Sequence, residues 1–311
     1  MDNSNLYDII IIGGGPGGLS AAIYAARSEM KTVLFEAGML GGQIATTTHV
    51  QNYPGSIQDC TGPKLTDRME EQAKEFGAEI AYEYVDSITK KDNIFIIKTS
   101  SKKIYESKTV IACLGATPKM LGIDGEAKFR GLGVSYCATC DGGFFKNKEI
   151  AVVGGGDTAL QEAIFLTKFA SKIYLIHRRD EFRGAKSLET KIRNTPKIEL
   201  VLNTVPLRIL GTSTVEGLEI QNKVTQEIST LKLDGVFMFV GYKPNSELLK
   251  DLAELDSQGY VKTNADMSTK TPGLFAVGDM IAKPLRQAIT AAADGAIASI
   301  SAEKYIENMN M

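Results

Sequence analysis

The chain contains two copies of one unit: a buried strand, a glycine-rich turn, a helix and a second strand. In the first copy, a nearly continuous apolar run over residues 7–12 predicts a strand buried on both faces, as in a parallel sheet. It leads into Gly13-x-Gly15-x-x-Gly18 and an alanine-rich segment with helical spacing. The second strand is expected over residues 32–35 and leads into Glu36. This order is typical of a dinucleotide-binding βαβ unit.

The second copy begins with a strand over 149–153 and continues into Gly154-x-Gly156-x-x-Ala159. An amphipathic helix and a strand over residues 172–176 follow, and this strand leads into His177. The spacing from the first glycine to the residue after the second strand is the same in both copies. We therefore expect an α/β fold with two Rossmann-like, three-layer, dinucleotide-binding domains.

The domain boundaries are predicted from two further buried strands, at 107–114 and 234–240, each followed by glycine and proline. A chain of 311 residues is long enough for about two domains. We expect residues 1–116 and 245–311 to form one discontinuous domain. Residues 117–244 would form a second domain inserted into it.

Three other segments carry clear patterns. Residues 63–76 have helical spacing and a charged face, residues 80–85 resemble a strand, and a long helix is expected from about residue 284 to 308.

Composition excludes several classes of protein. The 35 basic and 37 acidic residues nearly cancel, which argues against nucleic acid as a main partner. No apolar run approaches the ~20 residues of a membrane span, and the N-terminus has no basic region like that of a signal peptide. Two histidines and four cysteines argue against a zinc site and against a secreted disulfide scaffold. We expect a cytoplasmic protein without metal.

The first glycine motif fits a pyrophosphate. Gly13 makes the turn, Gly15 lets backbone N–H groups approach the phosphates, and Gly18 lets helix and strand pack closely. The helix N-terminus adds partial positive charge. Glu36 occupies the position that holds a ribose hydroxyl. The alternative is a glycine-rich turn in an ordinary α/β sheet.

The second motif differs where the nucleotide is selected. In place of an acid it has His177, Arg178 and Arg179, with Arg183 close behind. Guanidinium groups bind a 2′-phosphate that a carboxylate would repel, so this unit is expected to hold NADP(H). The alternative is a solvated basic loop.

Cys137 and Cys140 form a CxxC pair, which in a cytoplasmic α/β protein indicates a redox-active dithiol. Two structural thiols are the alternative, and a zinc half-site would need a second pair. Asp141 follows directly and is either a proton donor to a leaving thiolate or a turn residue. Because a flavin commonly links a hydride donor to a disulfide, we expect FAD in the first unit.

These residues resemble the low-molecular-weight, bacterial-type thioredoxin reductases over nearly the whole chain. The segments that carry the resemblance are GGGPGGLSAA, GGQ (41–43), NYPG (52–55), CATCDG (137–142), HRRDEFR (177–183), TPGLFAVGDM (271–280) and RQAITAAADG (286–295).

The resemblance implies tightly but non-covalently bound FAD, together with NADPH. FAD would contact Gly13, Gly15, Pro16, Glu36, Gly42, Gln43, Asn52, Val85, Gly278, Asp279, Arg286, Gln287 and Ala288, the last three at the start of a helix that points at the flavin. NADPH would contact Gly156, Asp157, Thr158, His177, Arg178, Arg179 and Arg183.

The resemblance also implies that Cys140 faces the flavin, that Cys137 attacks the disulfide of thioredoxin and that Asp141 moves the proton. Arg130, Phe144 and Phe145 match positions that help dock thioredoxin, although two adjacent aromatics fit a domain core equally well. The family is dimeric, so a homodimer is expected.

Both the dithiol and the NADPH motif must reach one flavin. We therefore expect the inserted domain to rotate about linkers near 116–119 and 242–246 between half-reactions. The alternatives are an NADPH disulfide reductase for another acceptor, such as a glutaredoxin-like protein or a peroxidase subunit, and a non-catalytic flavin redox sensor.

Overall fold

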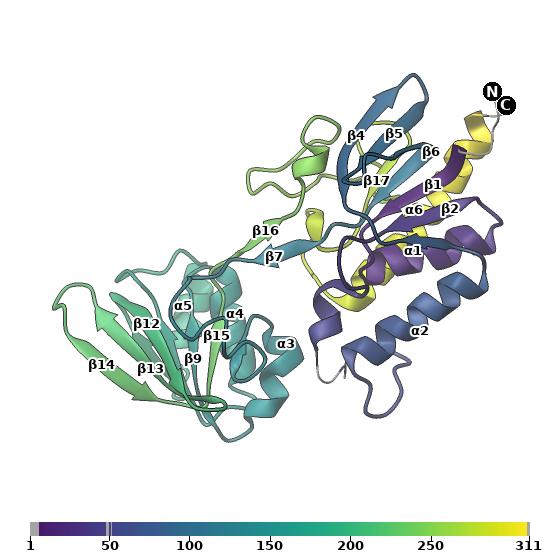
Figure 1. Ribbon diagram of the computed structural model, residues 1–311. Helices are drawn as coiled ribbons and strands as arrows, with labels where there is room; N and C mark the ends of the chain where they lie inside the picture. The colour runs from purple at the N-terminus through teal and green to yellow at the C-terminus, as the bar shows by residue number, and fades with distance from the viewer. Residues whose placement is uncertain (1–5, 48–49, 51, 310–311) are drawn as a thin grey trace. The chain divides into compact units, whose positions relative to one another are not determined.

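The computed structural model describes residues 6–47, 50 and 52–309. The chain divides into two compact units (Figure 1). The discontinuous unit comprises Met1–Thr117 and Lys243–Met311, and the inserted unit comprises Pro118–Tyr242. The chain passes between them twice, in strands β7 (Ala116–Pro118) and β16 (Tyr242–Pro244).

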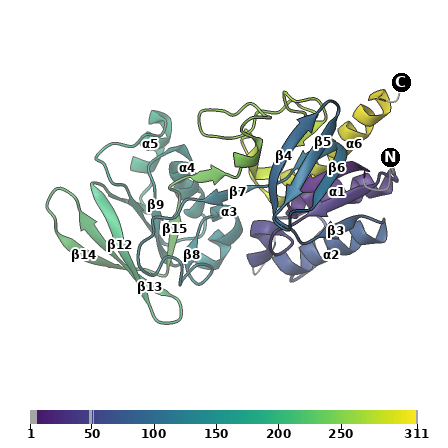
Figure 2. The ribbon, with the colours of Figure 1, turned by 45° about the horizontal axis from the view of Figure 1, so that its top comes forward.

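The discontinuous unit is built on a mixed sheet with the order β3-β2-β1-β6-β5-β4, in which β17 also pairs with β6. Strands β3, β2, β1, β6 and β17 are parallel, and the β4–β5–β6 meander is antiparallel (Figure 2). The strands are β1 (Leu6–Ile12), β2 (Thr32–Phe35), β3 (Glu79–Ala81), β4 (Val85–Lys91), β5 (Ile94–Thr99), β6 (Ile104–Ala112) and β17 (Leu274–Ala276).

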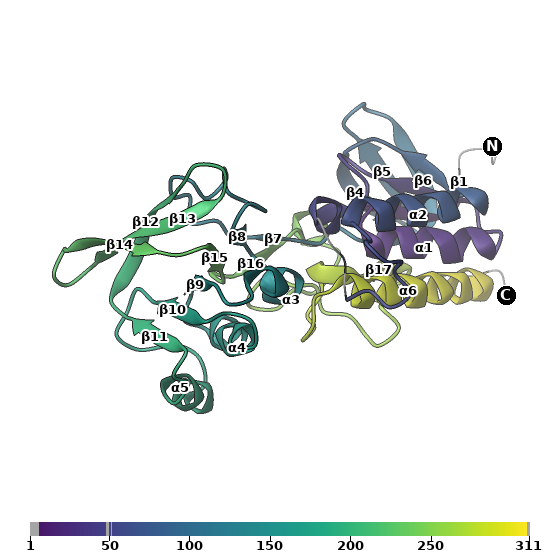
Figure 3. The ribbon, with the colours of Figure 1, turned by 90° about the horizontal axis from the view of Figure 1, so that it is seen from below.

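Both faces of this sheet are buried, as the apolar run in β1 predicts. Ile9 and Ile11 pack on one side with residues of the helices, whereas Ile10 and Ile12 pack on the other with the meander. Helices α1 (Pro16–Arg27), α2 (Gly62–Glu75) and α6 (Ala288–Met309) lie in a row (Figure 3). Short 3-10 turns are η2 (Gly42–Thr46), η4 (Glu247–Leu249) and η5 (Gly278–Met280). In the described part of the chain no helix is long and apolar enough to cross a membrane.

The inserted unit repeats the parallel arrangement with the order β11-β10-β9-β15-β8, and a separate antiparallel sheet has the order β12-β13-β14. Its strands are β8 (Val134–Ser135), β9 (Glu149–Val153), β10 (Lys172–Ile176), β11 (Ile198–Val201), β12 (Thr204–Gly211), β13 (Val215–Asn222), β14 (Ile228–Lys232) and β15 (Gly235–Met238). Its helices are α3 (Ala138–Asp141), η3 (Gly142–Phe145), α4 (Asp157–Leu166) and α5 (Lys186–Arg193).

Two expected elements differ from the structure. The strand expected over 80–85 is present only at its start, as β3, because the chain then leaves the sheet and enters it again at β4, with exposed Tyr82 and Tyr84 between. The last helix begins at Ala288 rather than near 284. The backbone N–H of Gln287 bonds to Thr290 Oγ1 (3.2 Å), which is half of a capping box and starts the helix there.

The two connections form a paired ribbon, because β7 and β16 lie side by side (Figure 1). At one end of the ribbon Lys119 N–H donates to the carbonyl of Gly241 (2.9 Å). At the other end Asn245 N–H donates to the carbonyl of Gly115 (3.0 Å), and its side-chain amide donates to Leu114 O (2.8 Å).

Candidate redox and nucleotide sites

The CxxC pair forms a disulfide at the start of α3. Cys137 and Cys140 are joined, with their Cα atoms 5.3 Å apart. Cys137 is the N-cap residue of α3, and Cys140 N–H donates to its sulfur (3.2 Å). The other two cysteines, Cys60 and Cys113, are free and buried. The cysteines thus divide into one disulfide within a single helical turn and two buried thiols.

Asp141 ends the same turn. Its backbone N–H donates to Cys137 O (3.1 Å), and its carboxylate accepts a hydrogen bond from Ser135 Oγ (2.6 Å). Burial raises the pKa of Asp141, and the Ser135 hydroxyl opposes that shift. A carboxyl group with a raised pKa beside a disulfide is suited to holding or releasing a proton.

The first glycine loop presents backbone to open space. Gly13 has φ +104°, and a Cβ there would lie 2.4 Å from Cys113 O, so only glycine fits. A Cβ at Gly15 would meet nothing within 4 Å. Helix α1 begins at Pro16 without a side-chain cap on its first turn. The uncapped N–H groups of the first turn and the free space at Gly15 fit a pyrophosphate.

Glu36 lies beside this loop. One carboxylate oxygen accepts from Gly14 N–H (2.7 Å) and the other from Gly38 N–H (2.8 Å). The following turn comes back over the loop, since a Cβ at Gly42 would be 3.5 Å from Gly15 Cα. Gln43 Nε2 donates to Ala116 O. The structure thus brings the expected Glu36 and Gly42 to the first glycine motif, whereas the Gln43 side chain bonds to the start of β7.

Asn52 and Gln287, which the family resemblance places at the flavin, meet in the structure. Asn52 Nδ2 donates to Gln287 Oε1 at 3.0 Å. Gln287 immediately precedes α6, so the N-terminus of a 22-residue helix lies at this contact. Val85 begins β4 and is buried.

Asp279 and Arg286 lie in the segment before α6. The Arg286 guanidinium donates to Asp279 O and Ile281 O (both 3.2 Å) and stacks on the Tyr260 ring at 4.0 Å. Burial raises the pKa of Asp279, and the positive charges of Lys283 and Arg286 oppose the shift.

The turn at Gly278 is anchored to α6. Gly278 N–H donates to Asp294 Oδ2 (3.0 Å), which also pairs with Lys283. With the open glycine loop, this polar segment beside a helix N-terminus gives the discontinuous unit residues that fit FAD.

The second glycine loop is also open. A Cβ at Gly156 would meet nothing within 4 Å, and α4 begins at Asp157 without a side-chain cap. Asp157 Oδ1 instead accepts from Ala185 N–H (2.7 Å), and Arg183 N–H donates to Gly155 O (2.8 Å). The segment that follows the basic cluster therefore packs against the glycine turn. Thr158, on the first turn of α4, is exposed.

The basic cluster separates into exposed and buried members. Arg178, Arg179 and Arg183 are exposed, and within the described residues their guanidinium groups make no ion pair. His177 is 5% exposed. Its ring lies 2.2 Å from where a Gly155 Cβ would be and stacks on Phe182 at 5.4 Å. The arginines are thus available to a phosphate, whereas the buried His177 ring packs against the glycine turn at Gly155.

The two adjacent aromatics point in different directions. Phe145 is buried and packs edge-on against Phe237 at 5.1 Å, so it belongs to the core. Phe144 is 44% exposed. Arg130 is exposed, and its guanidinium lies over the Tyr136 ring at 5.3 Å. Of the expected docking residues, Phe144 and Arg130 therefore remain at the surface.

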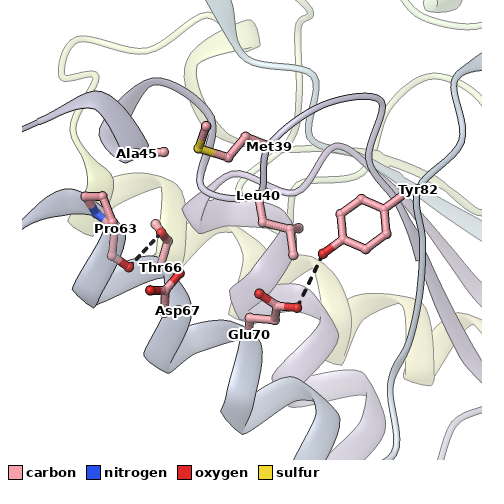
Figure 4. Close-up of a pocket in the computed structure, with 8 residues that line it drawn as sticks. All are labelled: Met39, Leu40, Ala45, Pro63, Thr66, Asp67, Glu70 and Tyr82. Carbon is pink, nitrogen blue, oxygen red and sulfur yellow. Dashed lines mark hydrogen bonds between the residues drawn. The ribbon is translucent and has the colours of Figure 1, made fainter.

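A small pocket of about 170 Å³, whose lining residues are drawn in Figure 4, adjoins the first glycine loop through Leu40. Its lining residue Leu40 also packs where a Gly14 Cβ would be, close to Glu36. The full lining is Met39, Leu40, Ala45, Pro63, Thr66, Asp67, Glu70 and Tyr82. The volume is smaller than the ~300 Å³ at which ligand pockets usually begin, so the pocket alone would not hold a dinucleotide.

Comparison with known proteins agrees with this arrangement. Residues 7–295 match the family described as pyridine nucleotide-disulphide oxidoreductase. A thioredoxin reductase from Peptoclostridium litorale is 48% identical, with 98% of each chain covered. The chain belongs to the thioredoxin reductase family.

Other members of the thioredoxin reductase family are similar along their whole length. The Bacillus subtilis (strain 168) thioredoxin reductase is 42% identical, covering 99% of this chain and 98% of that protein. The crystal structure of thioredoxin reductase from Streptococcus pyogenes MGAS5005 matches with a TM-score of 0.92 at 40% identity, covering 98% and 99% of the two chains. The Lactococcus lactis thioredoxin reductase structure, described as the FR conformation, matches with a TM-score of 0.68 at 40% identity, covering 97% and 99%.

Thioredoxin reductases of this family use FAD and NADPH. The two Rossmann-like units and the Cys137–Cys140 disulfide of this chain fit that chemistry.

Proposed function

We propose that this protein reduces oxidised thioredoxin with electrons from NADPH, and that Cys137 and Cys140 are the pair that exchanges with thioredoxin. The observation that carries the proposal is the disulfide at the start of α3, on the unit that also holds the exposed arginine cluster. The family and its relatives support the same conclusion.

The two glycine loops would hold different nucleotides. In the discontinuous unit, the open loop at Gly15 and the Glu36 carboxylate favour an unphosphorylated adenosine ribose, as in FAD. In the inserted unit, Arg178, Arg179 and Arg183 favour the 2′-phosphate of NADPH. When bound, FAD supplies a ring that accepts a hydride and delivers two electrons to a disulfide.

The dithiol form would act by thiol–disulfide exchange. The Cys137 thiolate attacks one sulfur of the thioredoxin disulfide, that bond breaks, and the leaving sulfur takes a proton. Cys140 then attacks Cys137 in the mixed disulfide and releases the second thioredoxin thiol. Two electrons and two protons pass from the enzyme dithiol to thioredoxin, and Asp141 is the group that moves protons.

We also propose that the inserted unit rotates between half-reactions. Its support is that both the disulfide and the arginine cluster belong to this unit, while the residues that fit FAD belong to the other. Two solved relatives of equal identity match this chain with TM-scores of 0.92 and 0.68, which indicates that relatives occur in different conformations.

Thioredoxin would dock on the surface that carries Arg130 and Phe144, which are exposed on the same unit as the disulfide.

Self-association as a homodimer would use α6, where Ile289, Ile297 and Ile300 are exposed along one helix face. Two free thiols are consistent with action in the reducing cytoplasm.

The test measures NADPH-dependent reduction of thioredoxin by the purified flavoprotein, coupled to a disulfide dye. Cys137→Ser and Cys140→Ser are expected to abolish dye reduction while FAD stays bound. Cys60→Ser, a buried free thiol, is the matched control and should keep the wild-type rate. Unimpaired reduction by either active-site variant would overturn the proposal, as would dye reduction that needs a glutaredoxin instead of thioredoxin.

A further inference from the structure

Ser135 lies directly behind the disulfide loop. It is the last residue of β8, is 4% exposed and precedes Cys137 by two positions. Its hydroxyl oxygen lies 2.6 Å from Asp141 Oδ2, 3.1 Å from Cys137 N and 3.2 Å from Cys137 O. One buried hydroxyl therefore contacts both the cysteine that would attack thioredoxin and the carboxyl that would move its proton.

The distances assign the direction of each hydrogen bond. The backbone N–H of Cys137 can only donate, so Ser135 Oγ accepts there. The hydroxyl has one proton, and two acceptors lie within reach of it: Asp141 Oδ2 at 2.6 Å and Cys137 O at 3.2 Å. Separations of 2.5–2.7 Å are typical of a hydroxyl donating to a carboxylate, so the proton is directed to Asp141.

The Ser135 hydroxyl is the group that opposes the effect of burial on the pKa of Asp141. Helix α4 and the η3 turn pack against α3. Strand β8 and η3 carry no charged residue, and α4 carries Asp157 and Glu162. The causes that shift the Asp141 pKa are burial, which raises it, and the Ser135 hydrogen bond, which lowers it.

We propose that Ser135 is a positioning residue for thiol–disulfide exchange: its hydroxyl fixes the Asp141 carboxylate on the Cys137 loop and stabilises its ionised form. The hydroxyl contacts the Asp141 carboxylate and the Cys137 backbone but neither sulfur atom, so it acts by positioning these groups, and on the proton through Asp141. The proposal rests on the proposed function only for the role of Asp141 in proton transfer.

The first experiment does not depend on turnover. In the oxidised flavoprotein the two sulfurs are bonded and do not titrate, so infrared difference spectra against Asp141→Asn isolate the Asp141 carboxyl as a function of pH. In Ser135→Ala the titration midpoint is expected to move up by about one pH unit, since a hydrogen bond to the charged form is lost. Ser135→Thr keeps the hydroxyl and should keep the wild-type midpoint. An unchanged midpoint in Ser135→Ala overturns the inference.

The second experiment measures the pH profile of thioredoxin reduction. The limb that disappears in Asp141→Asn should shift to higher pH in Ser135→Ala and return to its place in Ser135→Thr. Adding Ser135→Ala to Asp141→Asn should leave the pH profile unchanged, because the two residues act as one unit. A purely structural role would lower the rate equally at all pH values and overturn the inference. A wild-type protein that does not reduce thioredoxin would contradict the proposed function, while the infrared titration would still decide the role of Ser135.

Discussion

The side-chain amide of Asn52 donates a 3.0 Å hydrogen bond to Gln287 Oε1, across 235 positions of sequence. Gln287 precedes α6, and Asn52 belongs to the segment between η2 and α2. The bond ties a loop to the N-terminus of a helix where both residues are predicted to contact the flavin.

Asn52→Ala is therefore expected to weaken FAD binding about five-fold, the equivalent of ~1 kcal/mol for one neutral hydrogen bond. The measurement is the temperature at which flavin fluorescence appears as FAD is released. Gln221→Ala removes an exposed amide in the inserted unit that bonds to Gln226 (3.2 Å), and it should leave the release temperature unchanged. Equal release temperatures for wild type and Asn52→Ala would contradict the prediction.

The arginine cluster predicts nucleotide selectivity. Replacing Arg178 and Arg179 together by alanine should raise the Kd for NADPH about 100-fold, because two charge-assisted bonds to a phosphate are lost, and leave the Kd for NADH within two-fold. Titration calorimetry with each nucleotide measures both. Arg193→Ala is the control, since Arg193 is paired with Glu189 on α5. Equal losses for the two nucleotides would refute the phosphate role.

His177 predicts a pH dependence of stability. Burial lowers the pKa of His177 in the folded protein, a hydrogen bond with the Glu181 backbone opposes the shift, and the nearby arginines add to it. Below the ordinary histidine pKa of 6.5, the unfolded chain binds a proton at this residue that the folded chain does not bind. The free energy of unfolding therefore falls as the pH falls through that value.

The stability advantage of wild type over His177→Gln should therefore shrink by up to about 1.4 kcal/mol between pH 7.5 and 5.5. Urea unfolding of the flavoprotein at both values measures it. A constant difference between the two proteins would show that His177 titrates as freely in the folded state as in the unfolded chain.

Phe144 and Phe145 predict opposite phenotypes. Phe145→Ala removes a core side chain and should cost about 3–5 kcal/mol of unfolding free energy. Phe144→Ala should leave stability within ~0.5 kcal/mol and lower kcat/KM for thioredoxin. Thermal unfolding and thioredoxin kinetics, run on both variants, separate the two effects. If Phe144→Ala keeps the wild-type kcat/KM, the docking surface lies elsewhere.

The strands of the two βαβ copies are predictable from sequence because each is buried on both faces. The limits of β2, β9 and β10 agree with the expected apolar runs to the residue. Helix α5 has a weaker signal: within it, only Leu188 and Ile192 supply apolar side chains at helical spacing, so no helix was expected there.

The positions of the site residues are predictable from sequence where a motif fixes the backbone. They are not predictable where tertiary packing decides which side chain is buried or which groups meet. The CxxC pair and the two glycine loops follow from local sequence. Which of Phe144 and Phe145 is buried depends on Phe237, far along the chain. Ser135 carries no motif, and its role depends on the turn of α3 that brings Asp141 back to the end of β8.

The paired ribbon of β7 and β16 has a mechanical consequence. Stretching it, or sliding one connection along the other, breaks cross-strand bonds such as those of Lys119 and Asn245. Twisting distributes a small deformation over all of them, and two-stranded ribbons are the sheets that twist most. Rotation about the axis of the ribbon therefore disturbs these bonds less than stretching or sliding would.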